Sequence, residues 1–493
     1  MMATHALRVI GRAALAVLLA AAIAIPVAYR ATVCADDFVW ITNAWSDASL
    51  AKAFSVAWSN NFFFRPIDIL ANRLISPRPL DLVPILPVQI AGLLALTAGM
   101  WRLLALAGAS GDGPRLVATA WLWLHPATQL SVWSAGCSSQ TWCAAFGIWT
   151  MCAVLALPQE RPGWGRVASL AMLSAGGVVA KELFLGWATA AACVIVVRHV
   201  IFRGNQDLLQ SIKAAFPVLC AVLLPPCIWI GLRLWSTRFG EVMHDDSGDL
   251  YTLHGPATIL VNLATAVLGM FVQGPVHWAR FLALPWQLVP FVGAGLSYLF
   301  AAIGSSRAGG AVAGTPASLR LPLAVAIGAL AVWPALLIGK VSELYVMGPN
   351  ALIAALVGIG MTATDGPAKP GRWIAGLALL SIAVGGYASR SYHFSVTWSQ
   401  ARELREAVHR IAAGAPREGR LVIVVPESLR AAPMHSKYLV PPAVAAALAE
   451  SWVVKRLADP SLPEIQFLTP GPEATPGDDA PVLQPPSQRR VMW

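Results

Sequence analysis

The chain has 493 residues, of which 57% are apolar and only 12% are charged. Its mean hydropathy is +0.63, and a soluble globular chain carries about twice this share of charged residues. The net charge of +10 is spread over short segments without a long basic block. This distribution predicts membrane topology and contact with anionic lipid, and it excludes nucleic acid as a partner.

The first apolar run follows Arg8 and Arg12 and is long for a signal peptide, which favours an uncleaved first span. A span needs about 20 apolar residues. Stretches of suitable length for one span each are 7–29, 82–108, 214–234, 281–303, 320–339, 344–363 and 371–389.

Two further apolar stretches, 116–157 and 167–197, are too long for one span and have basic residues at both ends. Because basic loops stay on the inner side, each stretch should cross twice and turn at the outer face. The turns are expected near His125–Gln140 and at Lys181-Glu182.

Placing the basic loops inside gives about 11 spans, and residues 256–279 then lie along the outer interface. If that segment crosses and re-enters, the count rises to about 12 or 13. Arg233 falls on the outer side in this scheme, against the basic-inside trend. The spans form a transmembrane module over residues 1–390, followed by a tail, 391–493, on the outer side.

The long loop 30–81 lies outside and carries Trp and Phe among polar residues, which predicts helices in the membrane interface. The acidic loop 236–255 and the tail reach the same face. A transporter would more often place its polar residues near the membrane midplane. This segregation therefore favours a single extracytoplasmic active site.

The tail should begin with an amphipathic helix, followed by a short buried strand at Leu421–Val425 and disorder over 469–493. One face of that helix carries Trp398, Ala401, Leu404, Val408 and Ile411. Cys34 and Cys137 face the same aqueous side, so their pairing as a disulfide stays open.

Asp36 and Asp37 directly follow the first span. A carboxylate just outside the membrane can act as general base toward an acceptor hydroxyl or hold a divalent cation against phosphate. The alternative is solvated charge at a helix end. If a metal binds, Asp36 and Asp37 are the ligands we expect.

Arg65 and Lys181 are the candidate cations for a phosphate group, and Glu182 is placed to orient the group or the cations. Each charge of Lys181-Glu182 would cost about 2.5–3.5 kcal/mol at a helix centre, so both should reach water or a partner. The alternatives are an Arg65 side chain reaching toward lipid headgroups and a simple polar turn at Lys181-Glu182. His125 and Glu343, near the outer ends of spans, are candidate substrate contacts, although a lone His there is often only interfacial.

Taken together and in order, these segments resemble the GT-C glycosyltransferases, membrane enzymes that use polyprenyl-phosphate sugars. The superfamily includes protein O-mannosyltransferases and bacterial lipid A aminoarabinose transferases. The resemblance covers residues 1–390 in layout. It rests on Asp36-Asp37-Phe38, Phe64-Arg65-Pro66, His125-Pro126, Lys181-Glu182 and Ser342-Glu343-Leu344-Tyr345.

The resemblance implies an all-α, GT-C-like polytopic fold in a bacterial inner membrane, with the site on the periplasmic face. It also implies inverting transfer of a sugar from a polyprenyl-phosphate donor to a lipid, glycan or protein acceptor. Asp36 or Asp37 would be the base, with Asp36 favoured by its place in the motif, and Arg65, Lys181 and Glu182 would lie at the donor phosphate. His125, Glu343 and Tyr345 would be substrate contacts.

Two other classes stay open: an O-antigen polymerase-like or ligase-like enzyme, and a lipid or solute transporter. The former would be expected to carry a large late outer loop, and the latter a repeat symmetry, and neither feature stands out in this sequence. The sequence leaves the sugar, the acceptor and any need for a divalent cation undetermined.

Overall fold

The structure is a computed structural model of the chain. It describes residues 2–33, 41, 44–45, 47, 49–60, 64–158, 162–201, 207–236, 255–272, 288–309, 316–337, 343–362, 370–414, 420–424 and 464–468. Cys34, Asp36 and Asp37, most of the acidic loop 236–255 and residues 469–493 lie outside this set, and of Glu343 only the backbone is described.

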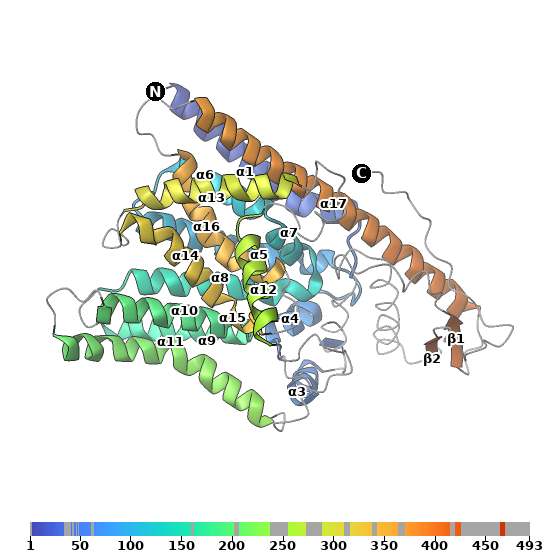
Figure 1. The fold of residues 1–493 in the computed structure, drawn as a ribbon. Coiled ribbons are helices and arrows are strands. Elements are labelled where there is room, and N and C mark those ends of the chain that lie inside the picture. The colour runs from blue at the N-terminus through green and yellow to red at the C-terminus, as the bar shows by residue number, and fades with distance from the viewer. Residues whose placement is uncertain are drawn as a thin grey trace.

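The described chain is almost entirely helical (Figure 1). Its longer helices are α1 (Met2–Ala28), α3 (Leu50–Asn60), α5 (Leu86–Leu106), α6 (Asp112–Leu124), α8 (Ser138–Leu155), α9 (Trp164–Ala180), α10 (Phe184–Val196), α11 (Leu208–Ser236), α12 (Pro256–Gly269), α13 (Val289–Arg307), α14 (Ala317–Ala331), α16 (Met347–Thr362) and α17 (Pro370–Ala413). The shorter ones are α4 (Pro66–Leu70), η1 (Ala71–Ile75), η2 (Val83–Ile85), α7 (Pro126–Trp133), η3 (Ala135–Cys137), η4 (Val197–Ile201), α15 (Trp333–Leu336) and η8 (Glu343–Val346).

The all-α polytopic fold expected from the sequence is confirmed. Five described helices are long and apolar enough to cross a membrane alone, and further apolar helices are shorter. The stretch 116–157 folds as α6 and α8 with a turn at 125–137, and the stretch 167–197 as α9 and α10 with a turn at Lys181–Leu183. Both turns therefore lie where the basic-loop pattern places them.

Helix α16 is the central element of the bundle, because it packs against α5, α6, α8, α13 and α14. Its closest partner is α13, and the two backbones meet at Gly304 and Gly360. A Cβ added at Gly304 would overlap the carbonyl oxygen of Leu356, and one at Gly360 would overlap that of Phe300. Glycine is therefore required at this helix crossing.

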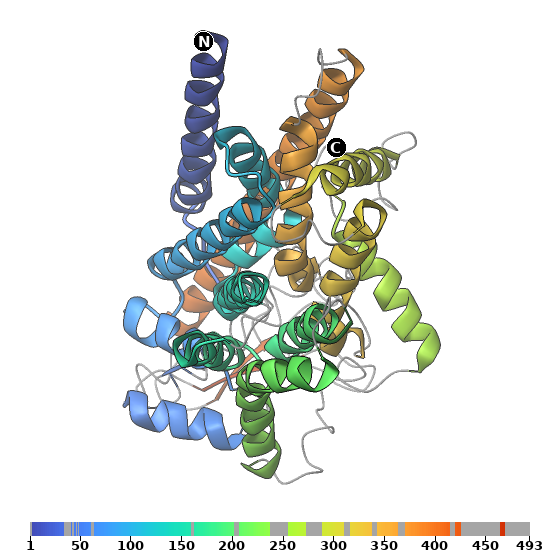
Figure 2. The same ribbon diagram turned by 90° about the vertical axis from the view of Figure 1, so that its left-hand side faces the viewer.

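Helix α12 runs across the bundle and not along it. Figure 1 shows it at a steep angle to α13 and α10, at the end of the bundle where α7 lies, and Figure 2 shows it lengthwise beside bundle helices that are seen nearly end-on. Asn262 donates to the carbonyl of Leu336 at 3.0 Å, and this bond holds α12 against the end of α15. This orientation favours the interfacial alternative for the described part of 256–279.

Helix α17 joins two elements that the sequence separates, the last span and the amphipathic helix of the tail. Its 44 residues correspond to about 66 Å at 1.5 Å per residue, roughly twice the apolar thickness of a bilayer. Figure 1 shows it extending beyond the bundle toward β1 (Arg420–Val424) and β2 (Glu464–Leu468). The domain boundary expected at 390 therefore falls inside a continuous helix.

The extended part of α17 buries the expected apolar face, since Trp398, Ala401, Leu404 and Val408 are all less than 9% exposed. The expected strand at Leu421–Val425 is observed as β1, and it pairs in parallel with β2, with Arg420 opposite Glu464. Ile423 is fully buried in this pair.

The outer loop 30–81 is closed at its base. Thr32 and Asp81 form an isolated antiparallel bridge, and the Thr32 hydroxyl donates to the carbonyl of Leu80 at 3.0 Å. From α17, Arg405 donates to the Thr32 hydroxyl at 2.8 Å, and Arg402 donates to the carbonyls of Tyr29 and Arg30. Helix α17 therefore fixes the point where the loop 30–81 begins.

The crossing of α13 and α16 generates a stability prediction. Gly304→Ala should lower the thermal stability of the detergent-solubilised protein by about 1–3 kcal/mol, because backbone must move to admit the methyl group. Gly295→Ala is the matched control on the same helix, since a Cβ there meets nothing within 4 Å. Equal melting temperatures for the two variants would contradict the tight crossing.

Candidate functional site

A proline places Arg65 in the candidate site. The residue before proline is pushed toward extended backbone, and proline itself suits the first position of a helix. Arg65 accordingly has φ −121° and ψ 84°, and Pro66 begins α4. The Arg65 side chain crosses to the turn between α9 and α10, which is 117 residues away in the sequence.

Arg65 and Glu182 form a two-point ion pair. The Nη2 of Arg65 lies 2.7 Å from Oε1 of Glu182, and its Nε lies 3.3 Å from Oε2. The two side chains are only 12% and 19% exposed. This planar geometry is the strongest form of carboxylate recognition by arginine and fixes both groups.

The ion pair sets the charge state of both partners. Burial acts against each charge, but the pairing outweighs it, so the pKa of Glu182 stays below its ordinary value and that of Arg65 rises above its own. Both groups are ionised at neutral pH.

Lys181 ends α9 in extended backbone, with φ −161° and ψ 138°. Its side chain is only 4% exposed, and its Nζ lies 5.5 Å from the ring centroid of Tyr345 in η8. Burial, and then the charge of Arg65, lower the pKa of Lys181. The ammonium is therefore held beside an aromatic face and a second cation, where a phosphate anion would be stabilised.

His125 occupies a structural position. It is the N-cap of α7, where its Nδ1 accepts from the backbone N–H of Ala127 at 3.2 Å. Its Nε2 therefore carries the proton and donates to the carbonyl of Gly269 at 3.0 Å, at the end of α12. Both ring nitrogens bind backbone, so His125 holds α7 and α12 together, and α7 in turn packs against η8, which carries Tyr345.

The structure thus brings together Arg65, Lys181, Glu182 and Tyr345 of the residues that the sequence predicts. Asp36 and Asp37 lie outside the described residues, and so does the Glu343 side chain. The residues that flank the acidic pair, Val33 and Ile41, are only 2% and 1% exposed.

Sequence analysis assigned no role to Asp68, which is fully buried one helical turn after Arg65. Its Oδ1 accepts from the backbone N–H of Ser139 at 2.9 Å, near the start of α8. The sequence does contain one indication of Asp68, because it is an acidic residue in the first turn of a helix that begins with proline, three positions after Arg65. Nothing in the sequence indicates that Asp68 binds Ser139.

An aromatic cluster supports the Arg65 segment. The Trp58 ring lies 5.3 Å from that of Phe64, and the guanidinium carbon of Arg233 lies 4.3 Å from the Trp58 ring centroid. Arg233 also donates to the carbonyl of Trp58 at 2.8 Å. Arg233 is thus buried by contacts with residues of the loop 30–81.

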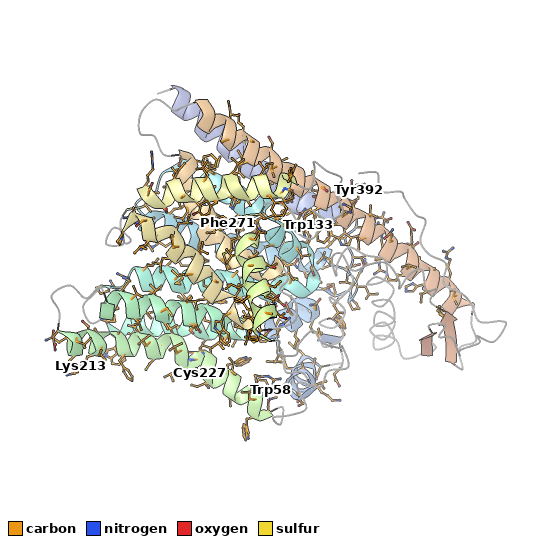
Figure 3. The ribbon with its side chains drawn as sticks, viewed as in Figure 1. Trp58, Trp133, Lys213, Cys227, Phe271 and Tyr392 are labelled. Carbon is orange, nitrogen blue, oxygen red and sulfur yellow. The ribbon has the colours of Figure 1, made fainter. Side chains whose placement is uncertain are left out.

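A large groove lies elsewhere in the molecule. It measures about 1190 Å³ and is lined mainly by apolar residues of α9 and α11, with Lys213 among them. Figure 3 shows Lys213 at one end of α11 (Leu208–Ser236) and Trp58 near the other end of the same helix. The charge cluster formed by Arg65, Asp68, Lys181 and Glu182 therefore remains the candidate site, and we refer to it as the charge cluster.

Comparison with known proteins supports the fold. No family model matches the sequence, and no curated protein matches it. The structure is similar to the crystal structure of ArnT from Cupriavidus metallidurans bound to undecaprenyl phosphate, with a TM-score of 0.52 and 10% sequence identity. The similarity covers 93% of this chain and 89% of that one, and it shows an overall helical fold like that of ArnT.

The Arg65–Glu182 pair predicts a measurable coupling. Arg65→Met and Glu182→Gln should each lower the melting temperature. The loss of unfolding free energy in the double variant should be about 0.5–3 kcal/mol smaller than the sum of the losses in the two single variants. The pair Lys52–Asp47, in which the Lys52 side chain is 68% exposed and the N–O distance is 2.7 Å, is the control and should give a coupling of about 0.2–1 kcal/mol. Strict additivity of the Arg65 and Glu182 variants would show that the pair does not stabilise the fold.

Proposed function

We propose that this chain is an extracytoplasmic glycosyltransferase that moves a sugar from a polyprenyl-phosphate donor to a lipid, glycan or protein acceptor. The observation that carries the proposal is the charge cluster itself. Two buried cations, Arg65 and Lys181, lie side by side with ordered counter-charges at one end of an apolar helical bundle. The overall fold is similar to that of ArnT, whose structure holds undecaprenyl phosphate.

The position of the cluster suits a lipid-linked phosphate. Lys181 and Glu182 lie between the ends of α9 and α10, and Arg65 lies on the outer loop. A donor whose prenyl chain stays in the outer leaflet would present its phosphate at this level. The acidic loop, the tail and the acidic pair share that side in the topology that the basic loops indicate. The membrane in question would be a bacterial inner membrane, with the site on its periplasmic face.

The chemistry is a single displacement at the anomeric carbon, with inversion. Asp36 or Asp37 accepts the proton of the acceptor hydroxyl as the glycosyl–oxygen bond forms. The bond from the anomeric carbon to the phosphate oxygen breaks, and Arg65 and Lys181 neutralise the charge that develops on the departing lipid phosphate. Glu182 holds Arg65 in orientation, and Tyr345 supports Lys181.

Donor binding tests the role of the cations. Lys181→Ala and Arg65→Ala should each weaken binding of a polyprenyl-phosphate sugar by about tenfold to a hundredfold, the effect of losing a charge-assisted hydrogen bond of about 1.5–3 kcal/mol. Lys213→Ala removes an exposed cation near the start of α11 and should leave binding unchanged. Wild-type affinity in both site variants, measured by titration in nanodiscs, would remove the charge cluster from donor binding.

Transfer tests the acidic pair. Adjacent residues in extended chain point their side chains apart, so only one carboxylate can face a shared site. We expect Asp36→Asn to abolish transfer and Asp37→Asn to spare it, with donor binding and membrane insertion intact in both. The measurement is loss of donor from a panel of polyprenyl-phosphate sugars. Full transfer by the double Asn variant would rule out this pair as the base, and absence of transfer by the wild type from every donor would contradict the proposed function.

A further inference from the structure

Asp68 is a buried carboxylate that the proposed reaction does not use. It lies in the first turn of α4, is 0% exposed, and its Oδ1 binds the backbone N–H of Ser139. Its Oδ2 has no hydrogen-bond partner within the described part of the chain. A buried oxygen without a hydrogen-bond partner destabilises the fold, and more so when it is charged, so the presence of Asp68 at this position calls for an explanation.

Neighbouring positive charge keeps this carboxylate ionised. Burial raises the pKa of Asp68 to about 6, while Arg65, the hydrogen bond from Ser139 and Lys181 pull it down. The start of α8 adds the positive end of a helix dipole. Asp68 therefore depends for its charge on the same two cations that are proposed to bind phosphate.

The surroundings of α4 hold few other charges. Of the charged groups near Asp68, Arg65 lowers its pKa most strongly, and Lys181 contributes less than the hydrogen bonds from Ser139. The titratable residues on the elements packed against α4, together with those that directly follow α9, are Lys52, Arg73, Cys137, Cys143, Cys152, Arg166, Lys181 and Glu182.

The charges of the cluster balance as long as the site is empty. The two positive charges of Arg65 and Lys181 face the two negative charges of Glu182 and Asp68. A phosphodiester donor adds one negative charge, and an uncompensated charge in a buried site is expensive. One proton on Asp68 restores the balance, because Glu182 is held ionised by its two hydrogen bonds to Arg65.

We propose that Asp68 is a charge-balancing residue that takes up a proton from solvent when a lipid phosphate binds to Arg65 and Lys181. Once the phosphate neutralises these cations, they no longer offset the burial of the Asp68 carboxylate, and its protonated form becomes the stable one. The Oδ2 atom receives the proton and becomes a donor. No covalent bond of the ligand changes in this step. The inference rests on the proposed function for the class of ligand.

The sign of the pH dependence follows from this proton uptake. Below about pH 6, Asp68 is protonated before the ligand arrives, so affinity does not depend on pH. Above that pH, binding of the ligand requires Asp68 to take up a proton from solvent, so the affinity for the ligand falls by up to about tenfold per pH unit. A phosphodiester probe is needed, because its own charge is constant over this range.

The experiment is calorimetric titration of the full-length protein in nanodiscs with a short-chain polyprenyl phosphodiester of glucose. Repeating it in buffers of different ionisation enthalpy counts the protons taken up. The wild type should take up most of one proton at about pH 7. Asp68→Asn keeps an oxygen for Ser139, so it should take up none and should bind more tightly than the wild type at about pH 8.

Asp81→Asn is the matched control, because Asp81 lies on the same outer loop and its side chain is 36% exposed beside Arg78. It should retain the wild-type proton count. Undiminished proton uptake in Asp68→Asn would assign the proton to another group, such as Lys181, and overturn the inference. So would weaker binding by Asp68→Asn at high pH with no change in proton count.

An infrared titration separates this inference from the proposed function and needs no folded variant. Without ligand, the wild type should show a buried carboxyl band that titrates near pH 6. Sulfate, whose charge is constant over this range, should shift the midpoint upward. If no polyprenyl-phosphate sugar of the donor panel binds but sulfate shifts the band, the proposed function fails and the role of Asp68 stands. A midpoint unmoved by both sulfate and the glucosyl phosphodiester contradicts the inference.

Discussion

The ion pair between Arg65 and Glu182 joins the outer loop to the helical bundle, and the geometry of the candidate site depends on it. Its two hydrogen bonds connect segments 117 residues apart. The same stretch of the loop is anchored twice more, by Asp68 at the start of α8 and by Trp58 on Arg233 of α11. These polar contacts add to the aromatic packing of Trp58 against Phe64 in the same loop.

Burying charged side chains at one end of an apolar bundle costs desolvation free energy. In this structure the pairing of opposite charges offsets that cost. Lys181 is almost fully buried, and burial lowers its pKa. The face of Tyr345 and the carboxylates around it offset part of that penalty. An arrangement of this kind is poised for an anion, since the cations are already ordered and partly desolvated before one arrives.

The rest of the fold holds this end of the bundle in place. Helix α12 lies across it, where His125 and Asn262 bind backbone carbonyls. Helix α17 extends beyond the bundle, and its Arg402 and Arg405 bind the base of the loop that carries Asp36 and Asp37. The bundle supplies the rigid support, with backbone-to-backbone packing at Gly304 and Gly360.

The sequence by itself determined the membrane character, the turns at His125 and Lys181-Glu182 and the apolar face of the α17 extension. Both kinds of prediction need only the order of residues along the chain. Charged residues are unfavourable inside the lipid bilayer, and apolar residues at helical spacing mark a buried helix face. The sequence also placed Arg65, Lys181, Glu182 and Tyr345 among the candidate residues, through resemblance and charge.

Only the tertiary structure decided which of these groups meet. The pairing of Arg65 with Glu182, the capping of α8 by Asp68, the crosswise course of α12 and the unbroken α17 all depend on contacts between distant segments. The sequence pattern does not predict these contacts, because the packing of the helices in three dimensions decides which side chains meet.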